Sequence, residues 1–507
     1  MRKIAAIILA ALLLCSCSNP SSYTPTGNAL DEQGMTRPTL VEEERPQNFS
    51  LVYDPAKTLN PYTCTDQNNR VLFSLLYQSL FTVNKDYKAE PQLCRSFSVS
   101  ADGSSYVFYI HPAQFSDGTT LTAADVAASL EAARTSPVYS GRLYNVEAIS
   151  LTGDGGVQVD LATAYENLPL LLDIPILRAS QLGADFPAGT GPYALQSSAV
   201  GRWLRLRQDW WCKASLPISA EEISLVTALT PKIIRDKFEL SGVGLVCADP
   251  SADSYVDFRC DHELWDCENG IFLYLGCRAK SSVFSNNAVR QALTHAINRD
   301  LLVKEYYRTF AQAANLPASP HSPYYNQALA DRYGFDAALF RQAISAEGME
   351  GKSIVLLVNS ADGRRTRVAQ SIAQMLEDCG LKVTVKAVSG TSYTGALKNG
   401  QYDLHLGQTM LSPNMDLTAF YASDGTLNYG GMSDSGVYSL CQDALANSGN
   451  YTALHQAAME DAMLCPVAFL SYAVYVQPGL VEDFAPARDR IFFYSLGKTV
   501  EEIRIKN

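Results

Sequence analysis

The sequence predicts an α/β protein with more than one domain. The chain has 507 residues, more than one hydrophobic core usually organises, and about 150 residues per domain gives an expectation of three domains. Hydrophobic residues make up 47% and charged residues 18%, an ordinary globular composition that argues against collagen-like, coiled-coil and wholly disordered chains. Residues 351–407 alternate apolar strands with amphipathic helices, which is typical of a parallel sheet covered by helices.

The charge balance argues against one class of main partner. The chain carries 40 Lys and Arg against 52 Asp and Glu, a formal net charge of -12. Phosphate backbones are bound by concentrated positive charge, so an acidic surface argues against nucleic acid as the main partner.

The chain begins with a segment typical of export. Arg2 and Lys3 are followed by an unbroken apolar run, residues 4–14. That run is too short for a permanent membrane helix, which needs about 20 residues, but it fits the core of a signal peptide. The sequence Leu14-Cys15-Ser16-Cys17 resembles a bacterial lipoprotein box, which implies cleavage before Cys17 and acyl chains on that residue. The alternative is an ordinary secretory signal with an incidental cysteine.

A tether follows the signal peptide. Residues 18–47 are dominated by Ser, Pro, Thr, Asn and Glu and have no helical or strand periodicity. We therefore expect the folded part to begin near Phe49, and we expect no later segment to span a membrane.

The first folded segment predicts a strand, a helix and a hairpin. The strand starts at Leu51 and ends at Asp54-Pro55, and residues 71–81 have apolar side chains at helical spacing. Two short strands, 97–99 and 104–110, flank the turn at Asp102-Gly103.

Residues 115–126 contain the sequence signals that begin a helix. Asp117-Gly118 makes a turn, Thr122 is placed to cap a helix, and Asp125 three residues later completes a capping box. The helix is predicted to run to about Arg134.

Residues 351–407 predict the unit β-α-β-α-β. Ile354–Val358 is an apolar strand suited to burial on both faces, and Arg364–Cys379 is an amphipathic helix. Leu381–Ala387 alternates as a half-exposed strand, and Tyr402–Leu406 is a third strand. Ligand clefts of such units lie at the carboxyl ends of the strands. A helix at 451–463 and an apolar strand at 466–476 follow.

The cysteines favour neither a metal site nor a disulfide framework. Ten of the 12 cysteines lie beyond the signal peptide, with no C-x-x-C and no zinc-like spacing among them. We expect most of them to be buried thiols and predict no metal or cofactor, while a pairing of Cys260 with Cys267 stays open.

Several short motifs occur together in one order. They are the lipoprotein-like N-terminus, Leu59-Asn60-Pro61-Tyr62, Phe115-Ser116-Asp117-Gly118, Leu121-Thr122-Ala123-Ala124-Asp125-Val126, Gly189-Thr190-Gly191-Pro192-Tyr193, Val289-Arg290-Gln291-Ala292-Leu293 with Ala296-Ile297-Asn298-Arg299, and Tyr402-Asp403-Leu404 with Asn414-Met415-Asp416. In this order they resemble the extracytoplasmic solute-binding proteins of bacterial ABC importers, family 5, the dipeptide, oligopeptide and nickel-binding type. The resemblance covers nearly all of the chain from Phe49 onward.

The resemblance implies a two-lobed α/β fold of the periplasmic-binding-protein type (type II, cluster C), with a hinge and an inserted α+β subdomain. The expected parts are a signal peptide at 1–16, a lipidated tether at 17–47, lobe I at 48–83 with 174–272 and 472–507, the inserted subdomain at 84–173, and lobe II at 273–471. Ligand would be enclosed between the lobes by hinge closure.

One departure from the family bears on the ligand. In peptide binders of this family, an aspartate shortly after the Tyr-Asp-Leu strand pairs with the N-terminal ammonium of the peptide. Leu411 or Ser412 occupies that position here, so we predict that a free ammonium is not the main determinant of binding. Asp416 matches a later aspartate that usually shapes the loop, and ligand contact is its alternative role.

The candidate ligand contacts come from both lobes. They are Asn68 and Asn69 from the first lobe, Gln408, Met410, Leu411, Ser412 and Asp416 after the third strand of the α/β unit, and Asn428 and Tyr429 as a lid. No catalytic residue is predicted.

Two motifs that suggest a more specific ligand lack the surrounding sequence that such a role requires. Gly189-Thr190-Gly191-Pro192-Tyr193-Ala194 fits the dinucleotide fingerprint G-x-G-x-x-A, but no buried strand precedes it and Pro192 lacks the N–H that a phosphate needs. A structural turn is expected instead. Trp210-Trp211 is expected to pack in the core rather than to stack on a ligand.

The function predicted by these observations is capture rather than chemistry. The expected partners are a peptide or other small solute, ABC permease subunits with their cytoplasmic ATPases, and the membrane through the lipid on Cys17; a monomer is expected. The alternatives are a surface lipoprotein that senses ligand without import and a secreted hydrolase. No nucleophile–base motif supports the hydrolase.

Overall fold

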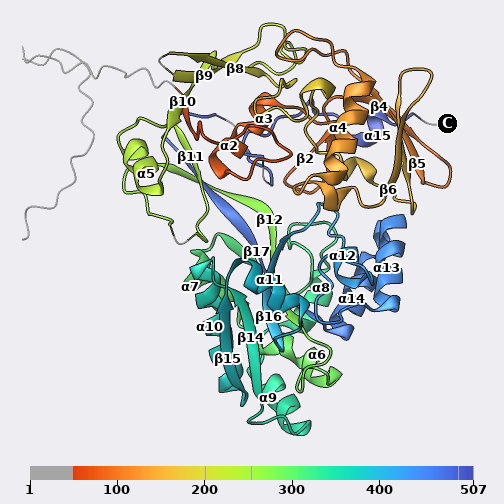
Figure 1. The fold of residues 1–507 in the computed structure, drawn as a ribbon, viewed down its shortest axis with the longest axis vertical. Coiled ribbons are helices and arrows are strands. Elements are labelled where there is room, and N and C mark those ends of the chain that lie inside the picture. Colours follow the sequence, from red (N-terminus) through yellow and green to blue (C-terminus); the bar gives the residue numbers. More distant parts are fainter. Residues whose placement is uncertain (1–48, 200, 253, 483, 489, 506–507) are drawn as a thin grey trace, which may run out of the picture. The chain divides into compact units, whose positions relative to one another are not determined.

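The computed structural model describes residues 49–505 except 200, 253, 483 and 489. The predicted signal peptide, the tether and Cys17 lie outside this range. Within it, a mixed sheet joins strands from most of the chain in the order β15-β14-β16-β12-β17-β11-β1-β10-β9-β8, with β13 paired to β17 (Figure 1). These strands are β1 (Ser50–Tyr53), β8 (Tyr193–Ser198), β9 (Gly201–Leu206), β10 (Glu222–Thr227), β11 (Leu245–Ala248), β12 (Glu263–Cys277), β13 (Ala311–Ala313), β14 (Ser353–Asn359), β15 (Lys382–Val388), β16 (Leu404–Met410) and β17 (Leu464–Val476).

Two smaller sheets are separate from the large one. The first is an antiparallel sheet in the order β4 (Cys94–Val99), β5 (Ser105–Ile110), β7 (Val157–Leu161) and β6 (Val146–Leu151). The second is the hairpin of β2 (Phe81–Val83) and β3 (Ala89–Pro91).

The helices pack around these sheets. In chain order they are α2 (Gln67–Val71), α3 (Phe73–Leu76), α4 (Ala123–Thr135), α5 (Pro231–Glu239), α6 (Asn287–Ala296), α7 (Arg299–Tyr307), α8 (Gln327–Ala330), α9 (Ala337–Ala346), α10 (Gly363–Asp378), α11 (Gly390–Lys398), α12 (Thr418–Tyr421), α13 (Ser435–Ala446), α14 (Tyr451–Asp461) and α15 (Val500–Ile503). Short 3-10 helices lie at Ser140–Arg142, Leu168–Leu171, Ala179–Gln181, Asp331–Tyr333 and Ser448–Asn450.

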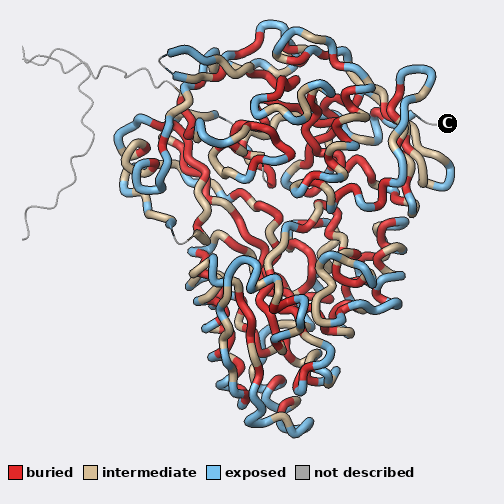
Figure 2. Tube along the Cα trace, in the orientation of Figure 1, coloured by how far each residue is buried: buried red, intermediate tan, exposed pale blue. Residues whose placement is uncertain are grey.

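The fold is two-lobed, and each lobe has its own hydrophobic core. Lobe I contains β1, β8 to β11 and the two smaller sheets, and its core includes Tyr53, Phe81 and Phe108. Lobe II contains β13 to β16, and its core includes Phe272 and Phe340. Figure 2 shows buried residues along the strands of both lobes and exposed residues on the outer loops and helix faces. The limits that the sequence predicts for the lobes and for the inserted subdomain stay a prediction.

Two long strands belong to both lobes. β12 pairs with β17 from Glu263 to Glu268 in lobe I and again from Phe272 to Gly276 in lobe II. The pairing shifts register between Glu268 and Phe272, where Gly270 has a positive φ of 73°. The strands therefore connect the lobes through a bulge, a feature that locally bends and twists a sheet.

Most predicted elements are confirmed. Thr122 and Asp125 form the capping box of α4, with both reciprocal hydrogen bonds present. β14 is parallel to β15 and β16, as the β-α-β-α-β prediction requires. The predicted helix 71–81 is wrong, because the helical spacing covers only α3 and the apolar run from Phe81 pairs with β3 instead.

The glycines of the rejected dinucleotide fingerprint have a packing role. A Cβ on Gly189 would lie 2.1 Å from the carbonyl oxygen of Leu76, and a Cβ on Gly191 would lie 2.5 Å from that of Leu75. The amide of Gly191 donates to Leu76 O at 2.9 Å. Glycine is needed here because the backbone passes directly against α3.

The tryptophans and cysteines lie mostly in the protein interior, as the sequence predicts. Trp210 is buried, and Trp211 stacks on His111 with ring centroids 4.5 Å apart. The ten cysteines from Cys64 to Cys465 are free thiols, nine of them buried and Cys260 partly exposed.

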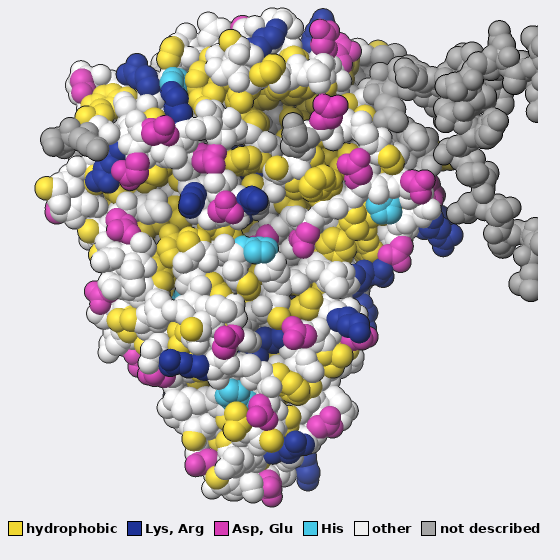
Figure 3. All heavy atoms as spheres, turned by 180° about the vertical axis from the view of Figure 1, so that it is seen from behind, with side chains coloured by type: hydrophobic (Ala, Val, Ile, Leu, Met, Phe, Trp, Pro, Cys, Tyr) yellow, Lys and Arg dark blue, Asp and Glu magenta, His cyan; other side chains and the backbone are white. Residues whose placement is uncertain are grey.

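Among the described residues, no helix combines the length and the apolar character needed to cross a membrane. On the face in Figure 3, acidic and basic side chains are interspersed.

Candidate ligand site

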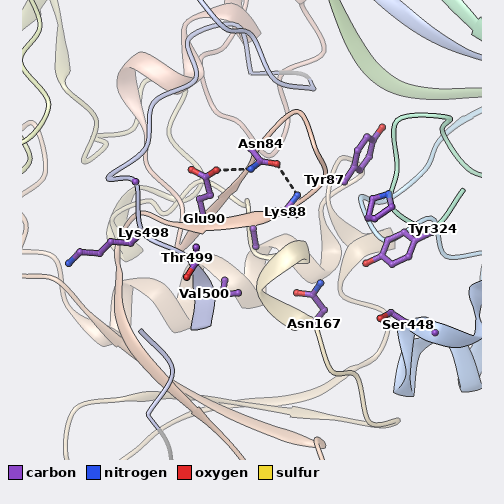
Figure 4. Close-up of a pocket in the computed structure, with 14 residues that line it drawn as sticks. Asn84, Tyr87, Lys88, Glu90, Asn167, Tyr324, Ser448, Lys498, Thr499 and Val500 are labelled. Atoms are coloured by element: carbon purple, nitrogen blue, oxygen red, sulfur yellow. Dashed lines mark hydrogen bonds between the residues drawn. The ribbon is translucent and has the colours of Figure 1, made fainter. Parts of the chain in front are cut away.

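A cavity of about 520 Å³ has walls from both lobes. Lobe I supplies the loop between β2 and β3, Asn167 and the segment 497–500, and lobe II supplies Pro323, Tyr324, Ser448 and Gly449. In Figure 4, Tyr87 and Tyr324 lie on one side of this cavity, and the side chain of Lys498 extends away on the other. A volume in this range suits a small ligand.

The loop between β2 and β3 is held rigid by its own hydrogen bonds. Asn84 donates to Glu90 at 2.6 Å and accepts from the backbone amide of Lys88 at 3.0 Å (Figure 4). Tyr87 has a positive φ of 57°, a conformation that non-glycine residues adopt rarely. The loop thereby presents Tyr87 to the boundary between the lobes.

Tyr87 and Glu268 form the centre of an inter-lobe network. The Tyr87 hydroxyl donates to one oxygen of Glu268, which lies on β12 just before the bulge. The other oxygen accepts from Ser319 Oγ at 3.0 Å and lies 3.0 Å from His321 Nδ1. Burial raises the pKa of Tyr87, and the hydrogen bond to Glu268 raises the pKa of His321. The network joins a lobe I loop, a connecting strand and a lobe II loop.

Arg488, in the C-terminal segment, contacts both Tyr87 and Leu411. Its guanidinium lies 5.6 Å from the centre of the Tyr87 ring, a cation–π distance, and its Nη2 donates to the carbonyl oxygen of Leu411 at 2.9 Å. Leu411 directly follows β16, so this hydrogen bond connects Arg488 to the predicted strand end.

Further contacts close the boundary on the side of α13. Tyr144 donates to Thr418 Oγ1 at 3.2 Å, and Glu166 accepts from the amide of Ser448 at 2.9 Å. Asp416 accepts from the amide and the hydroxyl of Thr418 at 3.0 and 2.7 Å, and burial raises the pKa of its carboxyl. Asp416 thus shapes its own loop, facing Tyr144 of the other lobe.

The residues predicted after the third strand of the α/β unit have different surroundings. Gln408 lies within β16 opposite Leu273, and Met410 is the exposed last residue of that strand. Leu411 is buried in the lobe II core, with its backbone facing Arg488, and Ser412 donates to Asn414 at 2.6 Å. These residues lie at the lobe boundary but do not line the cavity.

The lobe I candidates differ from each other. Asn68 is half-buried on α2, whereas Asn69 is fully buried. The Asn69 amide accepts from the amide of Asp54 and donates to the carbonyl oxygens of Asp54, Lys57 and Thr58. Because these backbone groups use its hydrogen-bonding capacity, we withdraw Asn69 as a ligand contact.

The lid predicted at Asn428 and Tyr429 stays a prediction. The Tyr429 ring lies 6.1 Å from that of His405, near the start of β16, and Asn428 donates to Ala422 O at 3.0 Å. His405 and Leu411 are six residues apart, about 20 Å along an extended chain. Tyr429 therefore packs near the start of β16, at the other end of that strand from Leu411.

The sequence prediction missed Tyr87, Glu268 and Arg488. A glycine at 270 inside an apolar strand is a signal for a bulge, and it could have pointed to Glu268. Arg488 lies in a segment without periodicity, so no local pattern could have indicated it. The described part of the chain holds no cluster of His, Cys, Asp or Glu suited to a metal ion.

Comparisons with known proteins agree with this architecture. Among solved structures, the substrate-binding protein CtaP of Listeria monocytogenes has a TM-score of 0.72 at 17% identity, covering 88% of this chain and 96% of that one. NikA of Brucella suis, in complex with Fe(III)-EDTA, has a TM-score of 0.69 at 20% identity, covering 88% and 98%.

Sequence comparison extends the likeness to curated proteins. The glutathione-binding protein GsiB of Pectobacterium atrosepticum is 26% identical over 349 residues, 65% of this chain and 67% of that protein. GsiB of Escherichia coli K12 is 25% identical over 393 residues, covering 73% and 74%. The model of the bacterial extracellular solute-binding proteins, family 5 Middle, matches residues 88–431, more than half of the chain. The resemblance inferred from the sequence motifs is confirmed: the chain belongs to the bacterial extracellular solute-binding proteins of family 5.

Proposed function

We propose that the protein captures a peptide or a similar small polar solute between its lobes and delivers it to the permease of an ABC importer. The observation that carries the proposal is the cavity of about 520 Å³ with walls from both lobes. Family relatives named for glutathione binding, and the likeness to DppA of Helicobacter pylori in complex with the peptide STSA, support this ligand class. The protein acts by binding, without a chemical step.

Capture requires the lobes to separate and close. The lobes are joined by β12 and β17, and they also contact each other through hydrogen bonds and apolar packing, since Tyr87 of lobe I is buried in the lobe II core and Leu445 of lobe II in the lobe I core. Opening therefore breaks these hydrogen bonds and exposes the side chains that pack across the boundary, while most of each core stays within one lobe. A solute that contacts both lobes binds the closed form more tightly and shifts the population toward it.

We propose that contacts come from the cavity and from the strand end beside it. Tyr87, Asn167 and Tyr324 are candidates in the cavity, and Gln408, Met410 and Ser412 are candidates at the end of β16. Asn68 stays a candidate from lobe I. Since Leu411 replaces an acidic residue, N-acetylated peptides should bind about as well as free peptides.

We propose further that Cys17 carries the lipid that holds the protein at the outer side of the cytoplasmic membrane or of the outer membrane. Two or three acyl chains anchor a protein stably, because each buried methylene contributes about 0.8 kcal/mol. Metabolic labelling with a fatty acid tests this, with Cys17→Ala expected to remove the label.

Binding is tested by thermal shift and calorimetry with glutathione, di- and tripeptides and their N-acetylated forms. A ligand at a hundredfold excess over Kd should stabilise the folded protein by about 2.7 kcal/mol. Asn167→Trp, which fills the cavity, should abolish the shift, while Glu147→Trp on the exposed face of β6 should preserve it. Equal shifts in both variants would place the ligand elsewhere, and no shift with any of these solutes would reject the peptide class.

A further inference from the structure

Arg488 is a buried cation whose hydrogen-bonding capacity is largely unused. The residue is 5% exposed, and its Nε and Nη1 have no hydrogen-bond partner among the residues that the structure describes. A guanidinium has five N–H donors, of which one, on Nη2, donates to Leu411 O. Within the described ranges it also forms no ion pair with an acidic side chain.

Such an arrangement is costly for a protein that has no use for it. A buried charge without a partner loses its hydration and regains little, so buried charges are normally paired. The ring of Tyr87 compensates only in part, because a cation–π contact leaves the N–H donors unused.

The fold makes room for this guanidinium. A Cβ on Gly270, at the bulge of β12, would lie 2.6 Å from Arg488 Nη2, so the glycine lets the guanidinium lie directly against the bulge. Arg488 itself has a positive φ of 49°, and Cys267 Sγ donates to its carbonyl oxygen. Strained backbone held in place by its surroundings is concentrated at functional sites.

Glu268, the acidic residue hydrogen-bonded to Tyr87, does not form an ion pair with Arg488. Glu268 accepts from Tyr87 on one oxygen, and its other oxygen faces Ser319 and His321. Both oxygens are therefore engaged with partners other than Arg488.

The free donors fit one chemical group. A guanidinium has two edges on which two N–H groups point in parallel, and Nη2 contributes one N–H to each edge. Leu411 O occupies one N–H of Nη2, so whichever edge it takes, the other edge remains complete. A complete edge binds a carboxylate through two parallel hydrogen bonds.

We propose that Arg488 binds a carboxylate of the captured solute through this edge. The inference rests on the proposed function and assigns the solute class: a peptide or amino-acid derivative recognised by its acidic end. It also accounts for Leu411, because a site that offers a cation at the end of β16 has no need of an aspartate for an ammonium group.

The first experiment compares tripeptides and glutathione with their C-terminal amides, using calorimetry on the wild type and on Arg488→Gln. The acids should bind the wild type about ten- to a hundredfold more tightly than the amides, and Arg488→Gln should bind the two alike. Arg259→Gln, which removes an exposed arginine of lobe I, should behave as the wild type. If Arg488→Gln does not fold, Arg488→Lys replaces it, with a weaker preference for the acid expected.

A second experiment does not depend on peptide binding. Succinate and glutarate, compared with their diamides at constant ionic strength, should raise the Tm of the wild type and of Arg259→Gln but not of Arg488→Gln. If this holds while no peptide or glutathione binds, the proposed peptide function fails and the carboxylate site stands. Equal binding of acids and amides by the wild type, or an acid preference retained by Arg488→Gln, overturns the carboxylate site and leaves solute capture in place. Should no peptide bind and simple carboxylates shift both proteins alike or neither, the carboxylate site is overturned as well.

Discussion

The two neighbouring asparagines of α2 have opposite surroundings. Asn69 is fully buried, and its amide makes four hydrogen bonds to the backbone of residues 54–58, whereas Asn68 is half-buried with no side-chain hydrogen bond among the described residues. One residue therefore holds the turn after β1, and the other is available to a ligand.

We expect Asn69→Ala to lower the free energy of unfolding by about 3 kcal/mol, because the buried Asn69 side chain and its four hydrogen bonds to the backbone of residues 54–58 are lost. Asn68→Ala should change it by less than about 0.5 kcal/mol. Urea denaturation of both variants measures the difference. Equal stability of the two would contradict the structural role assigned to Asn69.

Only some of the individual residues of the candidate site could be predicted from the sequence. The end of β16 follows from strand periodicity, since ligands bind at strand ends of α/β units. The partner of Leu411 O is Arg488, 77 residues further along the chain, and that contact arises from tertiary packing alone. Asn69 was misjudged because a buried and an exposed asparagine look alike in a turn-rich sequence.

Among the elements, α3 and the segment before β8 pack with unusually close backbones. Gly189 and Gly191 lie directly against the carbonyl groups of Leu75 and Leu76. Because Gly189 and Gly191 have no Cβ atom, their backbone can approach α3 this closely.

Gly191→Ala should therefore destabilise the protein by about 1–3 kcal/mol, since the new Cβ would lie 2.5 Å from a backbone oxygen that cannot rotate away. Gly183→Ala is the matched control, because its Cβ would meet no atom within 4 Å. Thermal unfolding compares the two. A Gly191→Ala variant as stable as Gly183→Ala would mean that α3 can move aside.

The same packing shows where element prediction succeeds and where it fails. Long amphipathic helices such as α10 and capped starts such as that of α4 are determined by neighbouring residues, and both were predicted. The residues 71–81 were predicted as one helix, but α3 ends at Leu76 and Phe81 joins β2. Pairing with β3 and contact with the glycine segment override the local spacing.

For the whole molecule, two buried histidines connect stability to pH. His405 on β16 and His455 on α14 are buried in lobe II, and burial lowers the pKa of each to about 4. In the unfolded chain a histidine has a pKa of about 6.5. Between these values the unfolded state binds protons that the folded state does not, so stability is complete above pH 6.5 and falls as the pH drops toward 4.

Each histidine should remove about 3 kcal/mol of stability across this range, at about 1.4 kcal/mol per pKa unit. We expect His455→Phe to reduce the pH dependence of the free energy of unfolding by one proton. Tyr451→Phe alters the ring that packs 5.8 Å from His455 without removing a histidine, and it should keep the wild-type dependence. An unchanged dependence in His455→Phe would show that this ring has the same pKa in the folded and the unfolded protein.

The shared strand β17 has a consequence for the order in which the chain can fold. It spans Leu464–Val476 and pairs with β11 and β12 in lobe I and with β12 and β13 in lobe II. As the polypeptide emerges from the ribosome or a translocon, neither lobe's part of the large sheet can be completed until these late residues arrive. Both halves must therefore wait in an incomplete state with unpaired strand edges, a condition that exposes a nascent chain to aggregation and makes chaperone protection during emergence valuable.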